Sequence, residues 1–246
     1  MSIVLVTGGA SGLGKEICLA FQKVGYTVLF TYNKTRPSDE LKGCHGYQCD
    51  LSSEDEIKNL LNSIYSEYKN IDVLINNAAI EINKDISSRT KKDFINTLEV
   101  NLVAPFLLCK GIGARMYLNE KGKIINISSN NSIDKFDPIT IDYDASKAGL
   151  NILTKCFAKE YAPFVNVNAI APGWILTDKI KKLDDSLDNK FIEEESKSIL
   201  LNRFASCEDI VNLLLFLASD KSNYINGEII KIDGGSYDRW QNYWII

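Results

Sequence analysis

Apolar and polar positions along the chain follow two alternating patterns. Short apolar runs end at a turn, and longer segments follow in which apolar residues recur every three or four positions. In the segment 54–68, for example, Ile57, Leu60 and Ile64 fall on one face of a helix. The runs that we expect to be strands lie at 3–7, 27–31, a short segment that ends at Cys49, and then 71–78, 122–129, 165–173 and 227–233.

Strands that alternate with helices require crossover connections, and such connections join parallel strands. The apolar runs also lack polar alternation, which is typical of strands covered on both faces. We therefore predict an α/β fold with a doubly wound, mostly parallel sheet of seven strands and helices on both faces. No repeat, low-complexity tract or linker interrupts residues 1–246, so a single domain is expected.

One charged segment, residues 178–198, departs from the composition of the rest. Within it, apolar residues fall on one helical face: Ile180, Leu183, Leu187 and Phe191. The segment is either a helix on the solvated surface or a mobile lid whose apolar face closes over a substrate. It follows a loop at 171–178 that could contact a bound cofactor, and this position favours the lid.

The composition is ordinary for a globular protein, with 45% apolar and 24% charged residues. The formal net charge of −4 gives no electrostatic reason to expect nucleic acid or an anionic membrane as a partner. No run approaches the roughly 18 apolar residues of a membrane span, and the first residues lack the basic start of a signal peptide. Scattered cysteines and a single histidine, His45, favour buried thiols without a metal site. These features predict a cytoplasmic protein.

A glycine-rich turn, VTGGASGLGKEI at 6–17, joins the first expected strand to the first helix. Backbone N–H groups and the positive end of the helix dipole at such a turn can hold a pyrophosphate group. The common dinucleotide fingerprint G-x-G-x-x-G does not fit. The glycines fall instead at Gly8, Gly12 and Gly14, which is a weak signal when taken alone.

A tyrosine and a lysine four residues apart, Tyr143 and Lys147, form a second candidate site. The two share a helical face, so the lysine cation could help a phenol with a pKa of about 10 to transfer a proton near neutral pH. At about 4 Å and an effective dielectric constant of about 20, the attraction is about 4 kcal/mol. Asp142 and Asp144 oppose this transfer, and we expect both to be solvated and weak in effect. Alone, the pair would be a coincidence in most sequences.

Together these motifs resemble those of the short-chain dehydrogenase/reductase family. The resemblance runs along the chain in the order of that family: TGGASGLG, CDLS (49–52), NNAA (76–79), VNL (100–102), INISS (125–129), YDASK (143–147), APGWILTD (171–178) and NGEIIKIDGG (226–235). It implies a Rossmann-type sheet of seven parallel strands with NAD(H) or NADP(H) across the carboxyl ends of the strands. It also implies a homotetramer, with a homodimer as the alternative. The nearest resemblance is to 3-oxoacyl-[acyl-carrier-protein] reductases and similar carbonyl reductases.

The resemblance implies roles for individual residues. Tyr143 would donate the proton in carbonyl reduction, Lys147 would assist it and bind the nicotinamide ribose, and Asn101 would connect Lys147 through water to a proton relay. Ser129 would hydrogen-bond the substrate oxygen, but it stands one residue further from Tyr143 than is usual, so Ser128 stays open. The residues expected at the cofactor are Gly8, Ala10, Ser11, Gly12, Leu13, Gly14, Tyr32, Asn33, Lys34, Asp50, Leu51, Asn77, Ala78, Ala79, Tyr143, Lys147, Pro172, Gly173, Ile175 and Thr177.

The end of the second expected strand bears on the choice of cofactor. An acidic residue there would bind the adenosine ribose and repel a 2′-phosphate. The corresponding residue is Tyr32, which is followed by Asn33, Lys34 and Arg36. Because the segment has two cations and no carboxylate, it favours NADP(H) over NAD(H). The alternative is that both cations are solvated loop charges.

The sequence leaves the substrate open. The carrier-protein reductases present arginines where this chain has Glu120 and the region of Pro163 and Phe164, although Lys121 and Lys123 could replace them in part. A 3-oxoacyl thioester is therefore one expected substrate, with this departure against it.

Polar residues in the stretch 129–142, together with Glu81, would suit a sugar or another small polar keto compound. An NAD(H)-dependent sugar or hydroxysteroid dehydrogenase is the alternative within the family. A non-catalytic dinucleotide-binding sensor is the alternative from another class, although such a protein would not need to keep both Tyr143 and Lys147. Aromatic residues near the C-terminus are expected at a subunit interface: Trp240, Tyr243 and Trp244.

Overall fold

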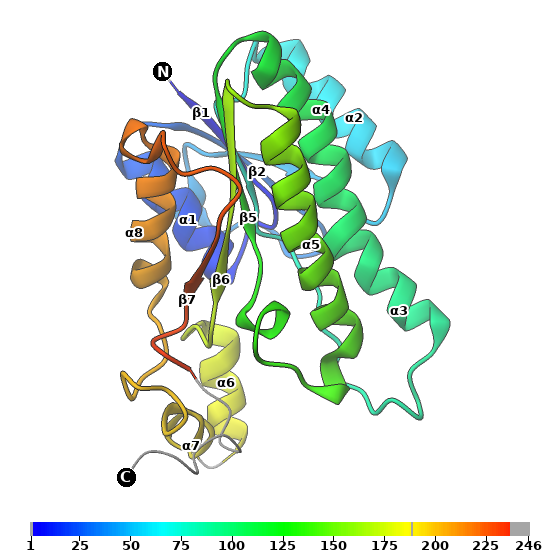
Figure 1. The fold of residues 1–246 in the computed structure, drawn as a ribbon, viewed down its shortest axis with the longest axis vertical. Coiled ribbons are helices and arrows are strands. Elements are labelled where there is room, and N and C mark those ends of the chain that lie inside the picture. The colour runs from blue at the N-terminus through cyan, green and yellow to red at the C-terminus, as the bar shows by residue number, and fades with distance from the viewer. Residues whose placement is uncertain (1, 188, 237–246) are drawn as a thin grey trace.

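All seven predicted strands are present in the computed structural model, which describes residues 2–187 and 189–236 (Figure 1). They are β1 (Ile3–Val6), β2 (Thr27–Tyr32), β3 (His45–Gln48), β4 (Val73–Asn76), β5 (Gly122–Ile127), β6 (Val165–Pro172) and β7 (Ile229–Ile232). The strands pair in the order β3-β2-β1-β4-β5-β6-β7, and every pairing is parallel. The predicted fold class is therefore confirmed.

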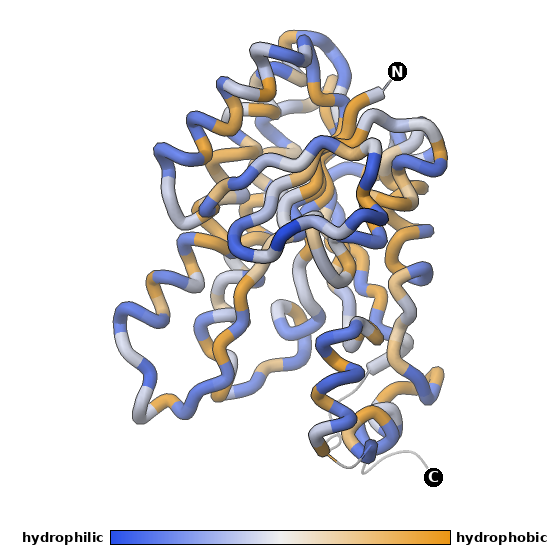
Figure 2. The backbone as a smooth tube through the Cα atoms, turned by 180° about the vertical axis from the view of Figure 1, so that it is seen from behind, coloured by the Kyte–Doolittle hydropathy of each residue, from blue (hydrophilic) through white to orange (hydrophobic). Residues whose placement is uncertain are grey.

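Helices cover both faces of the sheet (Figure 1). One face carries α1 (Gly12–Lys23) and α8 (Cys207–Ala218), and the other carries α2 (Glu54–Glu67), α4 (Ala104–Leu118) and α5 (Ile141–Glu160). Two clusters of buried apolar side chains result, one under each layer of helices. Figure 2 shows the apolar strands in the centre of the molecule. β4 and β5 are buried along their whole length, which explains why their sequences lack polar alternation.

The register of the sheet brings the carboxyl ends of its central strands level with one another. Val6 pairs with Phe30 on one side and with Ile75 on the other, and Asn76 pairs with Asn126. The direction of winding reverses between β1 and β4, and open α/β sheets bind ligands at such a point. The segments that follow β1, β2, β4 and β5 therefore meet at one edge of the sheet.

The long helix expected near 89–118 consists of α3 (Lys91–Leu98) and α4, joined by one π-helical turn at Glu99–Val103. The continuous run Lys91–Leu118 is long and apolar enough to pass a test for a membrane span. Its apolar residues have a structural role, however, because one side of α4 packs into the core: Ala104, Leu108, Cys109, Ile112 and Met116. A core helix passes the same test, so the run gives no reason to expect a membrane.

The charged segment 178–198 contains two short helices, α6 (Asp178–Ser186) and α7 (Phe191–Ser196), rather than one amphipathic helix. Asp184 connects the end of α6 to α7: its carbonyl oxygen accepts the N–H of Leu187, and its carboxylate accepts the N–H of Ile192 at 2.8 Å. The apolar spacing predicted one continuous helix, and the chain instead turns between α6 and α7.

Both helices lie beyond the carboxyl ends of the strands (Figure 1). Phe191 packs edge-on against Trp174, with 5.3 Å between ring centroids, whereas Leu183 and Leu187 are exposed. The apolar residues predicted on one face are thus divided between a packed helix and an open one. The residues predicted at a subunit interface, Trp240, Tyr243 and Trp244, lie outside the described residues.

Candidate active site

The glycine-rich turn connects β1 to α1 at the carboxyl edge of the sheet. Gly8 and Gly12 adopt φ angles of 67° and 52°, which glycine tolerates best. Gly14 is needed for another reason: a Cβ atom there would lie 2.1 Å from the carbonyl oxygen of Gly8. The other predicted residues of the turn lie between these glycines: Ala10, Ser11 and Leu13.

Two threonines that the sequence analysis missed hold this turn in place. The Thr7 hydroxyl accepts the N–H groups of Asn77 and Ala78, both at 2.9 Å. The Thr31 hydroxyl accepts the N–H of Gly8 at 3.1 Å. The turn and the NNAA segment, which includes the exposed Ala79, therefore form one hydrogen-bonded unit. The available sequence signal was a hydroxyl residue at the end of an otherwise apolar strand.

A cavity of 280 Å³ lies beside the turn. It is lined by the turn, by the loop after β6 and by the start of α8: Gly12, Lys15, Glu16, Leu176, Thr177, Asp178, Lys181, Ser206 and Cys207. A Cβ atom built on Gly12 would meet no described atom within 4 Å, so the backbone here faces open space. Backbone N–H groups at the N-terminus of a helix, facing such a space, fit the pyrophosphate of a dinucleotide.

Tyr32 is the last residue of β2, as the sequence predicted, and Asn33 and Lys34 follow it at the surface. Asp50 lies beside them after β3. Hydrogen bonds from Ser52, 2.9 Å from its N–H and 2.7 Å from its hydroxyl, lower the pKa of Asp50. The Asn33 side chain and the Lys34 charge act in the same direction. Asp50, one of the residues predicted at the cofactor, therefore stays ionised at neutral pH.

The cations after β2 are free to meet a ligand. Lys34 and Arg36 are exposed, and neither forms a salt bridge with another residue in the described part of the chain. Leu51, which follows Asp50, is buried in the hydrophobic core. The chemistry at this end of the sheet fits a nucleotide that carries additional negative charge.

The loop after β6 is fixed from two sides. Gly173 donates its N–H to the Ile232 carbonyl at 3.2 Å, and Leu176 donates to the Ala205 carbonyl at 2.8 Å. Gly173 has no room for a side chain, because a Cβ atom would lie 2.9 Å from the Cβ atom of Asp233. Of the other residues predicted at the cofactor, Pro172 ends β6, and Ile175 and Thr177 lie on this loop.

Tyr143 and Lys147 lie one turn apart near the start of α5. The Nζ atom of Lys147 is 5.5 Å from the centroid of the Tyr143 ring and donates to the Ile127 carbonyl at 2.6 Å. The side chain of Ser129 is near enough to Tyr143 to lower its pKa by hydrogen bonding. A hydroxyl, a phenol and an ammonium group thus meet at the carboxyl end of β5.

Ser128 points away from this group. Its hydroxyl lies 3.0 Å from the Ser132 hydroxyl and donates to the Lys147 carbonyl at 3.3 Å. Since Ser129 reaches Tyr143 and Ser128 is bound to the backbone of α5, the geometry favours Ser129 as the serine that contacts a substrate.

The protonation of the Tyr143–Lys147 pair differs from the prediction. Burial raises the pKa of Tyr143, as do the charges of Glu81 and Asp144, whereas the Ser129 hydrogen bond lowers it. Burial also lowers the pKa of Lys147 to about 8, and Glu81 acts in the opposite direction. In the free protein, burial and the charges of Glu81 and Asp144 thus oppose the predicted lowering of the Tyr143 pKa by Lys147.

Asp142 is fully buried, not solvated as predicted. Its carboxylate lies 2.5 Å from the Arg89 guanidinium and accepts the Thr97 hydroxyl at 2.8 Å. The second amino group of Arg89 donates to three carbonyls, those of Ile82, Lys84 and Ile139. Arg89, which the sequence analysis missed, therefore ties the loop after β4 to the start of α5.

Asp144 is also buried, at 9% exposure. Its carboxylate accepts the Asn131 side-chain amide and the Asp137 N–H, each at 2.9 Å, and the Thr140 hydroxyl at 3.1 Å. The segment between β5 and α5 is thereby fixed around the residue next to Tyr143. Both aspartates are anchors, and the predicted solvation is wrong because their partners come from other segments.

Asn101 lies buried in the π-helical turn. Its side chain forms two 2.8 Å hydrogen bonds with the backbone of Ile80 and donates to the Ser146 hydroxyl at 3.1 Å. Ser146 in turn donates to the Tyr143 carbonyl at 2.6 Å. Asn101 therefore connects the NNAA segment with the helix that carries Tyr143. Its link to Lys147 through water stays a prediction.

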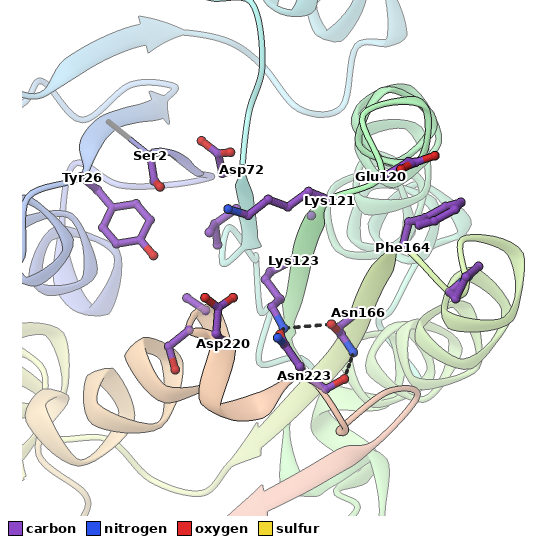
Figure 3. Close-up of a pocket in the computed structure, with 15 residues that line it drawn as sticks. Ser2, Tyr26, Asp72, Glu120, Lys121, Lys123, Phe164, Asn166, Asp220 and Asn223 are labelled. Atoms are coloured by element: carbon purple, nitrogen blue, oxygen red, sulfur yellow. Dashed lines mark hydrogen bonds between the residues drawn. The ribbon is translucent and has the colours of Figure 1, made fainter.

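A larger cavity of 600 Å³ lies at the opposite end of the sheet (Figure 3). It is lined by Glu120, Pro163 and Phe164, where arginines are expected in a carrier-protein reductase, and by the two lysines expected to replace them in part, Lys121 and Lys123. Lys123 is buried and donates to the Asn166 and Asn223 side chains at 2.8 and 2.6 Å, and burial lowers its pKa. The prediction that Lys123 could replace a surface arginine is therefore wrong. None of the residues predicted at the active site lines this cavity.

Comparison with known proteins agrees with the geometry. The chain matches the family model described as enoyl-(acyl carrier protein) reductase over residues 8–237. The 3-oxoacyl-[acyl-carrier-protein] reductase FabG of Thermotoga maritima is 36% identical over 242 residues, which are 95% of this chain and 96% of that protein. The structure of ElxO with NADP bound matches with a TM-score of 0.88 at 29% identity, covering 95% of this chain and 98% of the other. The ligand-free aldohexose dehydrogenase of Thermoplasma acidophilum has a TM-score of 0.87 at 27% identity and coverages of 95% and 93%.

The family match covers the glycine turn, the π-helical turn with Asn101 and the Tyr143–Lys147 pair. The relatives align along nearly the whole chain, so the likeness extends well beyond one motif. The strand order and the position of the candidate site agree with the structural matches. The chain belongs to the short-chain dehydrogenase/reductase family of NAD(P)-dependent oxidoreductases.

Proposed function

We propose that the protein is an NADP(H)-dependent oxidoreductase that interconverts a ketone and a secondary alcohol, with Tyr143 as general acid and base. The observation that carries this proposal is the convergence of Ser129, Tyr143 and Lys147 at the same edge of the sheet as the glycine turn. A carbonyl oxygen placed between Ser129 and Tyr143 would receive a hydrogen bond from each.

Each residue of this group has its own task. NADPH, when bound, supplies a hydride to the carbonyl carbon. Tyr143 supplies the proton that the carbonyl oxygen gains, while Ser129 holds that oxygen by a hydrogen bond. Lys147 is charged below about pH 8 and stabilises the phenolate that Tyr143 becomes. In alcohol oxidation the phenolate accepts the proton instead.

The preference for NADP(H) rests on the end of β2. Tyr32 offers no carboxylate that would repel a 2′-phosphate, and Lys34 and Arg36 are exposed cations. Guanidinium and ammonium groups are the usual partners of phosphate. The likeness to ElxO, whose structure has NADP bound, supports the same choice. An NAD(H)-dependent enzyme is the alternative that a direct comparison of the cofactors would identify.

A small polar keto compound fits the proposed site best. Two polar residues support this class: Asn131, whose N–H donates to the Ser129 hydroxyl, and Glu81, whose charge acts on Tyr143. The likeness to an aldohexose dehydrogenase supports this class. A 3-oxoacyl thioester is the second candidate, and the 36% sequence identity to the FabG of Thermotoga maritima supports it. Glu120 and Phe164, which stand where carrier-protein reductases have arginines, weigh against a carrier-bound thioester.

The test is the oxidation of NADPH in the presence of ketones, ketoses and 3-oxoacyl thioesters, measured by absorbance for the parent and for Tyr143→Phe. The variant is expected to bind NADPH with unchanged affinity and to lose at least about 100-fold in turnover. NADH serves as the cofactor control. If no carbonyl is reduced with either cofactor, the dinucleotide-binding sensor becomes the better account. If Tyr143→Phe reduces carbonyls as fast as the parent, the role of Tyr143 is wrong.

We further propose a homotetramer or homodimer in the cytoplasm, formed by one domain over residues 1–246 with a lid at 178–198. Exposed apolar residues on the outer side of α4 and α5 support association: Phe106, Leu118 and Ile152. The place of α6 and α7 beyond the strand ends supports the lid (Figure 1). Light scattering of the purified chain measures the oligomer.

A further inference from the structure

Glu81 follows the NNAA segment in a loop without regular secondary structure. The residue before it, Ile80, is bound by the side chain of Asn101 through two 2.8 Å hydrogen bonds. Asn101 also donates to Ser146 of α5, whose hydroxyl donates to the carbonyl of Tyr143. The start of this loop is thus attached to the turn of helix that carries the proton donor.

The end of the same loop is attached to the same region. Lys84 donates its N–H to the carbonyl of Ile139 at 3.1 Å, two residues before α5 begins. Hydrogen bonds at residues 80 and 84 therefore attach both ends of this loop to the region where α5 begins. Glu81 lies between these attachments, in the connection between β4 and α3.

Charged groups from three segments surround Glu81. Lys179 of α6 is the cation with the largest effect on it, and the remaining groups come from α5 and from the segment before it: Tyr143, Asp144, Lys147 and Asp137. Burial raises the pKa of Glu81. Across the described ranges its carboxylate forms no hydrogen bond or salt bridge, and the residue is exposed. Glu81 is thus a carboxylate without a hydrogen-bond partner in the described residues, and its charge acts on both Tyr143 and Lys147.

We propose that Glu81 determines specificity by accepting a hydrogen bond from a hydroxyl group next to the reacting carbonyl of the substrate. The substrate class is then a neutral hydroxylated ketone, or the corresponding polyol in the reverse direction. A carboxylate accepts a hydrogen bond from a hydroxyl group, whereas a methyl group would leave the carboxylate without a donor and a second carboxylate would be repelled. This inference rests on the proposed ketone reduction and names the substrates of that same site.

The test compares substrates that differ in one group beside the carbonyl. Hydroxyacetone carries the hydroxyl, 2-butanone has a methyl group in its place, and pyruvate carries a carboxylate. The measured quantity is kcat/KM with NADPH for the parent, for Glu81→Gln and for Glu81→Ala. Glu67→Gln, at an exposed position of α2, is the matched control. The ratio between two substrates is used because any change in the protonation of Tyr143 or Lys147 affects both equally.

The parent is expected to prefer hydroxyacetone to 2-butanone by about 10- to 100-fold, which is the usual effect of a hydrogen bond to a charged group. Glu81→Ala should reduce this ratio to near unity, Glu81→Gln should reduce it in part, and both should improve the use of pyruvate. Glu67→Gln should leave the ratio unchanged. A ratio that Glu81→Ala does not change overturns the role of Glu81, even if the protein reduces ketones. A parent that reduces 2-butanone and hydroxyacetone equally overturns the substrate class.

The failure of the proposed function gives a different result. In that case the parent would oxidise NADPH with none of the three ketones and with no 3-oxoacyl thioester. Unchanged affinity for NADPH in Glu81→Ala, measured by fluorescence titration, shows that the variant is folded and that its effect lies on the substrate side.

Discussion

The ion pair between Arg89 and Asp142 makes a quantitative prediction about stability. The two side chains are 4% and 0% exposed, and 2.5 Å separates their nearest charged atoms. Removal of one partner of such a pair leaves an uncompensated buried charge, which costs about 3 to 5 kcal/mol. In Arg89→Met, Asp142 would keep its hydrogen bonds from the Thr97 hydroxyl and from the Tyr143 N–H, at 2.8 and 2.9 Å. These bonds offset part of the cost, so we expect a loss of about 3 kcal/mol in the free energy of unfolding.

The measurement is equilibrium unfolding in urea, followed by circular dichroism at one protein concentration so that association does not differ between samples. Lys58→Met is the control, because Lys58 pairs with Glu54 at 3.1 Å while both side chains are 60% exposed. Its expected cost is small, because water and salt screen an exposed ion pair. If Arg89→Met costs no more than this control, the pair does not carry the stability assigned to it.

A second variant tests the reason for the loss. Arg89→Met combined with Asp142→Asn removes the unpaired charge and keeps a side chain of the same shape. We expect the double variant to recover at least about half of the loss, because the remaining cost is that of missing hydrogen bonds. A double variant that is less stable than Arg89→Met would show that the carboxylate acts through its hydrogen bonds alone.

The site residues allow kinetic tests. Ser129→Ala should lower kcat for carbonyl reduction by about 100-fold. Ser128→Ala should change kcat by less than about threefold, because the Ser128 hydroxyl donates to the backbone of α5. Equal losses in the two variants would contradict this difference. Burial lowers the pKa of Lys147 to about 8, so above this pH the developing phenolate of Tyr143 loses its cation. We therefore expect kcat/KM for reduction to be constant in acid and to fall as pH rises through about 8. A profile that rises there would contradict the role of Lys147. The double variant Lys34→Ala/Arg36→Ala should weaken NADPH binding by about 10- to 100-fold and leave NADH binding unchanged, as measured by fluorescence titration. Equal effects on the two cofactors would contradict a contact between these cations and the 2′-phosphate.

The fold could be predicted from the sequence because its determinants are local. Each buried strand is a short apolar run, and each amphipathic helix shows its own period, so the alternation alone predicts a parallel sheet. The residue at the end of β2, Tyr32, could be located for the same reason. The break between α6 and α7 could not be predicted in this way, because it depends on the carboxylate of Asp184 reaching the N–H of Ile192.

The surroundings of Tyr143 could not be predicted, because they are made by residues far apart in the chain. The i,i+4 spacing places Lys147 near Tyr143, and this local relation is present. Arg89, which neutralises Asp142, comes from the loop before α3, and Glu81 comes from the loop after β4. Spacing along one helix says nothing about such neighbours or about burial, which is the largest influence on the pKa values of Tyr143 and Lys147.

The two aspartates beside Tyr143 explain both its position and its protonation. Asp142 attaches the first turn of α5 to Arg89, and Asp144 attaches it to the segment that contains Asn131, so the phenol is held between two anchors. Asp144 and Glu81 also raise the pKa of Tyr143. At neutral pH the free protein therefore holds the phenol in its protonated form, which is the form that donates a proton in carbonyl reduction. Alcohol oxidation must first remove this proton against the same negative charges, so the residues that fix Tyr143 also favour its action as a proton donor.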